Sequence, residues 1–334
     1  MGGVGGLMVA VRSAGVDTWS PAWRIDPESW AGAQLASMAT RPTKGRSWQL
    51  PDAIAGHRVG WFPAAGMLYA EGHPVADGLA TAAQLPEAFL ALERALLASD
   101  VPLPPGVASD DFYGDRHPGF IGLRRLDTTV DIATDTPAIG AAIMAGVASV
   151  LGQAGVTETW RRRGALQTVY LRGDGGRRVL GRWYDKGAES GSAAPGRLIR
   201  PEDQRRWAKG QRRAPEELTA QYVRGLFHRR YASLWRATEG VTVAGPIVLA
   251  QKLADAVEAG EITAHHADRV AGYLLMEAVH VPRAGRTRRR RRSEAAALGL
   301  VLSDGLLQEV EVDLHGILDQ VMDADQWGDD DHGA

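Results

Sequence analysis

The sequence has no cysteine among its 334 residues. Disulfide bonds, thiolate zinc sites and thiol nucleophiles are therefore excluded. Long apolar runs are also missing, because the Gly-rich stretch 1–11 is too short to cross a bilayer and lacks an early positive charge. We therefore expect a cytoplasmic protein with no membrane partner.

Lysine is scarce, since only four of the 38 basic residues are Lys. The net charge of −2 conceals a strong segregation. Residues 151–240 hold 19 basic and 9 acidic residues, whereas residues 304–334 hold ten acidic residues and no basic one. A basic middle segment favours binding to a polyanion such as DNA. The alternative is an Arg-rich surface that is simply solvated.

Hydrophobic periodicity predicts strands first and helices later. The expected strands are 15–25 (interrupted at Pro21), 66–72, 120–134, 166–172 and 177–185, with helices at 84–98 and 138–153. Beyond residue 200 the pattern is helical, with candidate helices 201–213, 215–237, 245–259, 263–280, 286–300 and 305–321. Because strands and helices separate along the chain, we predict an α+β fold. It would combine largely antiparallel curved sheet with packed helices and a mainly helical C-terminal domain.

Composition suggests four segments. We expect a flexible start over 1–14, a strand-rich domain over 15–213, a helical domain over 214–300 that is a candidate for DNA recognition, and an acidic tail over 301–334. The Gly/Ser/Ala-rich stretch 187–197 is predicted to be a loop.

The run 182–186 places a tyrosine between two cations. On a strand, Arg182, Tyr184 and Lys186 would project from one face, with Trp183 and Asp185 on the other. Nearby positive charge stabilises a phenolate, and the same cations can hold a phosphate. Tyr184 is therefore a candidate nucleophile for attack on a phosphodiester. The alternative is an edge-strand tyrosine flanked by solvated basic residues.

The strand 120–134 carries two carboxylates on one face, Asp127 and Asp131. Oxygen ligands of this kind suit Mg²⁺ or Mn²⁺, which can polarise a phosphate. The alternative is that these carboxylates pair with neighbouring arginines, since isolated buried charge is costly.

Two Arg-rich runs are candidates for DNA contact, although a solvated helix or pairing with the acidic tail would also account for them. The residues concerned are Arg200, Arg205, Arg206, Lys209, Arg212 and Arg213 in the first run, and Arg288, Arg289 and Arg290 in the second.

Taken together, these runs resemble the Rep_trans-type replication initiation factors of rolling-circle plasmids, which have relatives in phages and integrated elements. The resemblance covers roughly residues 15–235 and is carried by short ordered motifs at Arg125–Asp131, Gln167–Arg172, Arg182–Glu189 and Arg200–Arg205. The sequence departs from the family at Gln167 and in the Arg-Gly-Asp-Gly-Gly turn, and its helical region from 214 onward matches no family segment.

The resemblance implies a DNA nicking-closing endonuclease that cuts one strand of origin DNA. Tyr184 would be joined to the 5′ phosphate, leaving a 3′-hydroxyl primer, while Arg182 and Lys186 clamp the phosphate. Asp127, Asp131 and Glu202 would bind Mg²⁺ or Mn²⁺. The implied partners are origin DNA, a host helicase and a second copy of the chain.

Two other functions stay open. One is a non-catalytic phage or plasmid DNA-binding regulator, in which the helices 245–259 and 263–280 carry recognition and Tyr184 is structural. The other is a mobilisation relaxase, although the sequence lacks the histidine cluster usual in those enzymes.

Overall fold

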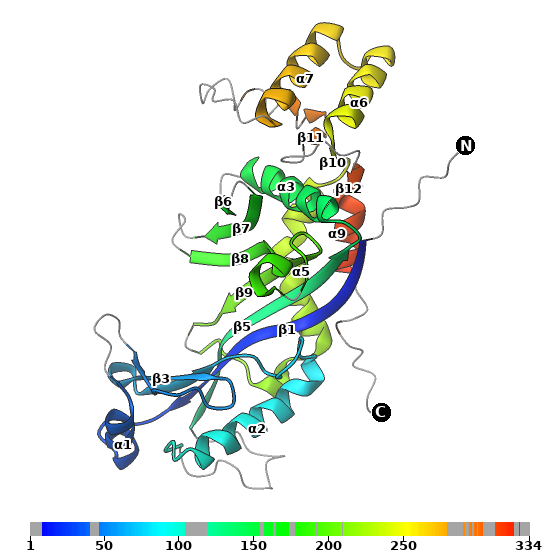
Figure 1. Cartoon of the computed structure of the whole chain (residues 1–334). Helices are drawn as coiled ribbons and strands as arrows, with labels where there is room; N and C mark the ends of the chain where they lie inside the picture. The colour runs from blue at the N-terminus through cyan, green and yellow to red at the C-terminus, as the bar shows by residue number, and fades with distance from the viewer. Residues whose placement is uncertain are drawn as a thin grey trace, which may run out of the picture. The chain divides into compact units, whose positions relative to one another are not determined.

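The fold combines a large antiparallel sheet with helices, which confirms the predicted α+β class (Figure 1). The computed structural model describes residues 9–40, 47–103, 119–153, 157–162, 165–173, 178–191, 193–208, 210–278, 290, 294–295, 297–298, 300–302, 311–323 and 327. Among these residues, no helix is long and apolar enough to cross a membrane.

Nine strands form the main sheet, in the order β2-β3-β4-β1-β5-β9-β8-β7-β6. Their bounds are β1 Val9–Arg24, β2 Trp48–Gln49, β3 Arg58–Phe62, β4 Met67–Glu71, β5 Phe120–Thr134, β6 Thr157–Arg162, β7 Ala165–Gly173, β8 Arg178–Asp185 and β9 Leu198–Arg206. A second sheet has the order β11-β10-β12, with bounds β10 Thr242–Ala244, β11 Leu300–Leu302 and β12 Glu311–Asp313.

The helices are distributed along the whole chain. Their bounds are α1 Trp30–Met38, α2 Leu85–Ala98, α3 Pro137–Gln153, α4 Lys186–Ser190, α5 Ala220–Ala237, α6 Pro246–Glu258, α7 Ala264–Ala278 and α9 Leu314–Met322. Short 3₁₀ turns occupy Pro63–Ala65, Ala82–Gln84 and Pro215–Glu217.

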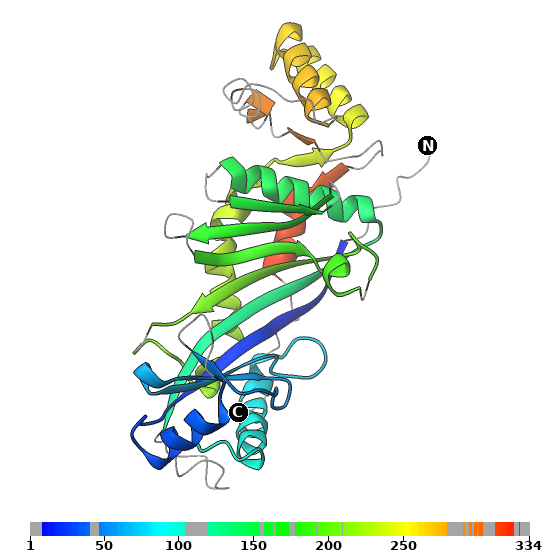
Figure 2. The ribbon, with the colours of Figure 1, turned by 60° about the vertical axis from the view of Figure 1, so that its left-hand side comes forward.

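The chain divides into two compact units. The main segments of one unit are Val130–Glu202 and His228–Ala324, and those of the other are Ser13–Thr129 and Asp203–Phe227. In the first unit, α3 packs against β6, β7 and β8 (Figure 2). In the second unit, the core includes Phe89 of α2, which stacks on Trp23 of β1 at a centroid distance of 6.0 Å.

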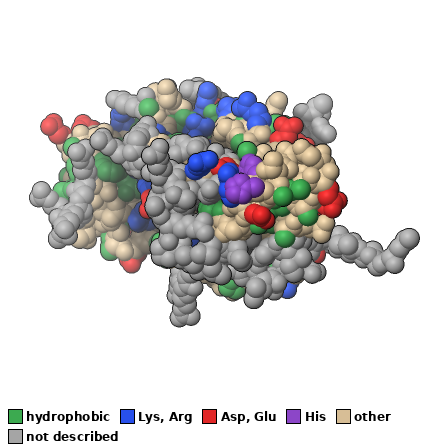
Figure 3. Space-filling model, turned by 90° about the horizontal axis from the view of Figure 1, so that it is seen from above, with side chains coloured by type: hydrophobic (Ala, Val, Ile, Leu, Met, Phe, Trp, Pro, Cys, Tyr) green, Lys and Arg blue, Asp and Glu red, His purple; other side chains and the backbone are tan. Residues whose placement is uncertain are grey.

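The helices α6 and α7 pack on each other through Leu249, Leu253, Val270 and Tyr273. These helices confirm the predicted segments 245–259 and 263–280. In the view of Figure 3, basic, acidic and histidine side chains all appear on the described part of this face. The described cations of this pair have partners, since Lys252 lies 2.9 Å from Glu311 and Arg269 lies 3.3 Å from Glu294.

Several elements differ from the prediction. The expected helix 201–213 is wrong, because residues 198–206 form strand β9 and the following residues are irregular. The loop expected at 187–197 begins with helix α4. Strand β1 runs through Pro21 without interruption. The candidate helix 305–321 is partly wrong, since it contains β12 before α9 begins.

Most of the predicted helix 286–300 and the turn residues 174–177 lie outside the described residues, and so do the last seven residues.

A buried carboxylate in α2 makes the stability of the second unit depend on pH. The Glu93 side chain is fully buried and accepts a 2.9 Å hydrogen bond from the Trp23 indole N–H. Burial raises the pKa of Glu93 from 4.5 to about 7; the Trp23 hydrogen bond opposes this rise, and the charge of Glu216 adds to it. The folded protein therefore holds a proton at Glu93 that the unfolded chain releases.

We expect the free energy of unfolding to fall as pH rises from 4.5 to about 7, because over this range the unfolded chain ionises Glu93 first. The difference between these pKa values corresponds to at most about 3 kcal/mol. The substitution Glu93→Gln should remove this dependence, which urea unfolding at a series of pH values measures. If the free energy of unfolding changes equally with pH in both proteins, Glu93 is not the titrating group.

Candidate active site

Strand β8 places Arg182 and Tyr184 on one face and Trp183 on the other, as predicted. Trp183 is fully buried and meets the Tyr231 ring of α5 edge to face at 5.8 Å. Strand alternation therefore directs Tyr184 away from α5. Lys186 differs from the prediction, because it is the first residue of α4 rather than part of the strand.

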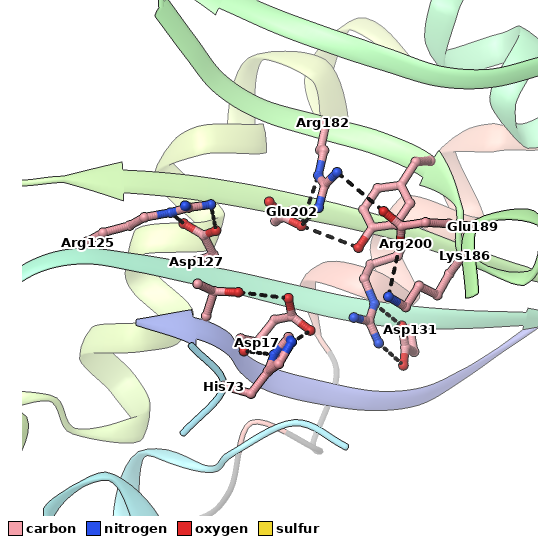
Figure 4. Close-up of polar contacts among 12 residues, drawn as sticks. Asp17, His73, Arg125, Asp127, Asp131, Arg182, Lys186, Glu189, Arg200 and Glu202 are labelled. Atoms are coloured by element: carbon pink, nitrogen blue, oxygen red, sulfur yellow. Dashed lines mark hydrogen bonds and ion pairs between the residues drawn. The ribbon is translucent and has the colours of Figure 1, made fainter. Parts of the chain in front are cut away.

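The Tyr184 hydroxyl lies against a buried carboxylate. It donates a 3.4 Å hydrogen bond to the Glu202 carboxylate of β9, which has no exposed surface. The Arg182 guanidinium lies 2.9 Å from the same carboxylate oxygen and 4.1 Å from the centre of the Tyr184 ring. Figure 4 shows Arg182 and Glu202 pointing toward each other from their strands. Glu202 thus has both a phenol and a guanidinium as partners.

The positive charge of Arg182 is maintained by its pairing with Glu202. Burial by itself lowers the pKa of Arg182, but the charge of Glu202 and its hydrogen bond outweigh burial and raise that pKa above its ordinary value. Arg182 therefore stays cationic beside Tyr184 at any working pH.

A second carboxylate, Glu189 of α4, connects the two cations beside the tyrosine. It lies 2.9 Å from Lys186 Nζ and 3.6 Å from Arg182 Nη1, and its side chain is 44% exposed. The Lys186 ammonium is 5.8 Å from the centre of the Tyr184 ring. Glu189 was not among the predicted site residues, although its spacing three residues after Lys186 is the pattern of a helical ion pair.

Asp185 holds α4 in place. Its carboxylate accepts hydrogen bonds from the backbone N–H groups of Ala188, at 3.0 Å, and Gly196, at 2.7 Å. Burial raises the pKa of Asp185 despite these hydrogen bonds. Its role in this structure is therefore to cap the helix.

Both predicted metal-binding aspartates are paired with arginines. Asp131 accepts two hydrogen bonds from Arg200 of β9, at 2.6 and 2.8 Å, and both residues are buried. Asp127, which is 1% exposed, is paired with Arg125, whose Nε lies 2.8 Å away. This arrangement matches the alternative in which the two carboxylates pair with arginines.

A divalent cation needs several oxygen ligands directed at one point. Each of the three predicted ligands instead faces a guanidinium: Asp127 faces Arg125, Asp131 faces Arg200 and Glu202 faces Arg182. Among the described residues, no three His, Asp or Glu side chains gather into a group that could hold a metal. The residues as arranged do not fit a metal site, and Mg²⁺ or Mn²⁺ stays a prediction.

The predicted DNA-binding arginines do not form one helix face. Arg200, Arg205 and Arg206 lie on β9, and Arg212 and Arg213 lie in the irregular segment after it. Arg290 is exposed and pairs with Glu294 at 3.1 Å, whereas Lys209, Arg288 and Arg289 lie outside the described residues.

Comparison with protein-family models and with curated proteins adds no relative. No protein-family model matches the chain, and no curated protein matches it at a significant level. The resemblance to replication initiators therefore rests on the short motifs alone.

The buried pair of Asp131 and Arg200 predicts a strong asymmetry between single and double substitutions. Arg200→Met should lower the free energy of unfolding by about 3 kcal/mol, because it leaves a buried carboxylate without its main partner. Adding Asp131→Leu should recover most of that loss, since a buried pair can be replaced by apolar groups. Urea unfolding measures both. A double variant no more stable than Arg200→Met would contradict this account.

Proposed function

We propose that this protein cuts one strand of DNA by attack of Tyr184 on a phosphodiester and later rejoins it, as the initiator of rolling-circle replication. The observation that carries the proposal is the phenol of Tyr184 lying between a proton acceptor, Glu202, and a permanent cation, Arg182. The replication context comes from the motif resemblance.

Each part of this group has a role in the transfer. The Tyr184 hydroxyl gives its proton to the Glu202 carboxylate 3.4 Å away while its oxygen forms a bond to phosphorus. The bond from phosphorus to the 3′-oxygen breaks, and that oxygen takes a proton for which the Lys186 ammonium is a donor. Arg182 stabilises the negative charge that develops on the phosphate oxygens. The phosphotyrosine retains the bond energy, so rejoining needs no nucleotide cofactor.

Phosphate entry requires a rearrangement, because the Tyr184 side chain is only 2% exposed. Glu189 is the exposed carboxylate that pairs with both Arg182 and Lys186. A DNA phosphate carries the same charge and can replace Glu189 as the partner of these two cations. Displacement of α4 by the DNA strand would then uncover the phenol oxygen.

The remaining parts of the proposal come from the resemblance. They are Mg²⁺ or Mn²⁺ as a cofactor, origin DNA as the substrate, a host helicase and a second copy of the chain as partners, and action in the cytoplasm.

A non-catalytic DNA-binding regulator is the second candidate function. The burial of Tyr184 and the pairing of Asp127 and Asp131 with arginines favour it, since a structural tyrosine would have the same surroundings. In that function the α6 and α7 pair would contact DNA.

The substitution Tyr184→Phe separates the two functions. We expect it to abolish nicking of supercoiled DNA carrying the matching origin, because no other group replaces the nucleophilic oxygen. The reaction is followed on agarose gels with Mg²⁺, with Mn²⁺ and with a chelator. Tyr170→Phe is the matched control, since Tyr170 lies directly opposite Arg182 on β7 and is half-buried. Nicking that persists in Tyr184→Phe would refute the nucleophile assignment. DNA binding without nicking by the unmodified protein under all conditions would support the regulator.

A further inference from the structure

The Arg212 side chain is a half-buried cation that lacks a strong acceptor among the described residues. Its Nε and Nη1 atoms are inaccessible to solvent and make no hydrogen bond within the part of the chain that the structure describes. Its Nη2 lies 3.3 Å from Met67 Sδ, which is only a weak acceptor. A guanidinium withdrawn from water in this way costs free energy, so its retention calls for a ligand.

The backbone holds Arg212 in this position. The N–H of Leu123 donates a 2.7 Å hydrogen bond to the carbonyl of Arg213. Gly122 has a φ of +90°, and a Cβ atom added there would lie 2.7 Å from Arg212 Cβ. The segment therefore packs closely on β5 where only glycine fits. Arg212 is thus fixed in the fold rather than free on a loop.

The charged groups that act on Arg212, Arg24 and Arg124, are also cations. Arg24 is exposed and lies directly opposite Met67 across β1 and β4. Burial lowers the pKa of Arg212, and the charges of Arg124 and Arg24 lower it further. Three guanidiniums therefore lie close together on this part of the sheet.

One carboxylate, Glu71, balances several arginines here. It lies 2.8 Å from Arg124, 2.9 Å from Arg125 and 3.4 Å from Arg58. Arg125 is also paired with Asp127, so two carboxylates face these three cations, which leaves an excess of positive charge beside Arg212. That excess attracts an anion.

Aromatic rings border the cations. Phe62 and Tyr69 stack with their centroids 5.2 Å apart, and the Arg124 guanidinium lies 4.0 Å from the centre of the Tyr69 ring. Phe62 is half-buried, so part of its surface is accessible. Arginines beside an accessible aromatic ring are typical of surfaces that bind a polynucleotide strand.

We propose that Arg24, Arg124 and Arg212 form a binding site for a backbone phosphate of single-stranded DNA, with Phe62 beside it for contact with a base. Arg212 is half-buried as a whole, and a turn of its side chain away from Met67 presents two N–H groups to the phosphate. This site lies in the second unit and does not depend on chemistry at Tyr184.

The variant Arg212→Met tests the site, with Arg94→Met as the matched control. Arg94 is an exposed arginine on α2 of the same unit, so its loss removes the same charge elsewhere. Fluorescence anisotropy of a labelled single-stranded oligonucleotide, over a salt series, measures binding. We expect Arg212→Met to weaken binding about tenfold and to reduce the salt slope by about 1. Arg94→Met should change neither value.

Stability distinguishes a ligand-binding arginine from a structural one. Urea unfolding of DNA-free Arg212→Met should show equal or higher stability, because the lost guanidinium has only a weak acceptor. A destabilised variant with unchanged DNA affinity would overturn the proposal. Arg24→Met, at an exposed position, should also weaken binding, and unchanged affinity there would likewise count against the site.

A test with inorganic phosphate distinguishes DNA from free phosphate as the ligand of this site. If phosphate raises the melting temperature of the unmodified protein but not of Arg212→Met, without competing with the oligonucleotide, the site binds free phosphate and the DNA assignment is wrong. If no protein nicks DNA while Arg212→Met still weakens binding, the phosphate site stands and the nicking proposal fails.

Discussion

The Glu202 carboxylate has no contact with solvent, yet it lies at the centre of a strand in the main sheet. A charge in such a position is tolerated only when partners surround it. Arg182 supplies the opposite charge at 2.9 Å, and the Tyr184 hydroxyl supplies a second hydrogen bond. This requirement ties β8 to β9 and places a phenol beside a proton acceptor. The same contacts that satisfy a buried charge therefore also assemble the chemistry proposed for Tyr184.

The buried charges of Asp131 and Arg200 are also neutralised by pairing, but this pair has no part in the proposed reaction. Asp131 and Arg200 satisfy each other through two short hydrogen bonds. Pairs of this kind fix strand register, because a shift of one residue would bury both charges without partners. We therefore assign Asp131 and Arg200 to the framework of the sheet, and Arg182, Tyr184 and Glu202 to the reaction.

Sequence patterns located the elements that have simple periodicity. The alternation in 120–134 predicted β5, and the amphipathic repeat at 84–98 predicted α2, which buries one apolar face. The pattern failed at β9, where charged residues such as Arg200 and Glu202 are buried in the sheet and Pro201 resembles the start of a helix. Partners far away in the sequence, Asp131 and Arg182, neutralise those charges, and local periodicity carries no signal of such pairing.

Only part of the candidate site was predicted from the sequence. The alternation of Arg182, Trp183 and Tyr184 followed from strand geometry alone. The role of Glu202 beside the tyrosine did not, because it depends on β9 lying next to β8. The cluster of Arg24, Arg124 and Arg212 was equally hidden, since its members are far apart in the chain.

Peptide mapping of the protein–DNA adduct tests the central claim most directly. The protein is trapped during cleavage of origin DNA, digested with nuclease and protease, and the modified peptide is identified by mass spectrometry. The account predicts a nucleotide joined through its 5′ phosphate to the oxygen of Tyr184. A nucleotide on any other residue, Tyr170 included, or cleavage without any covalent adduct, would contradict it.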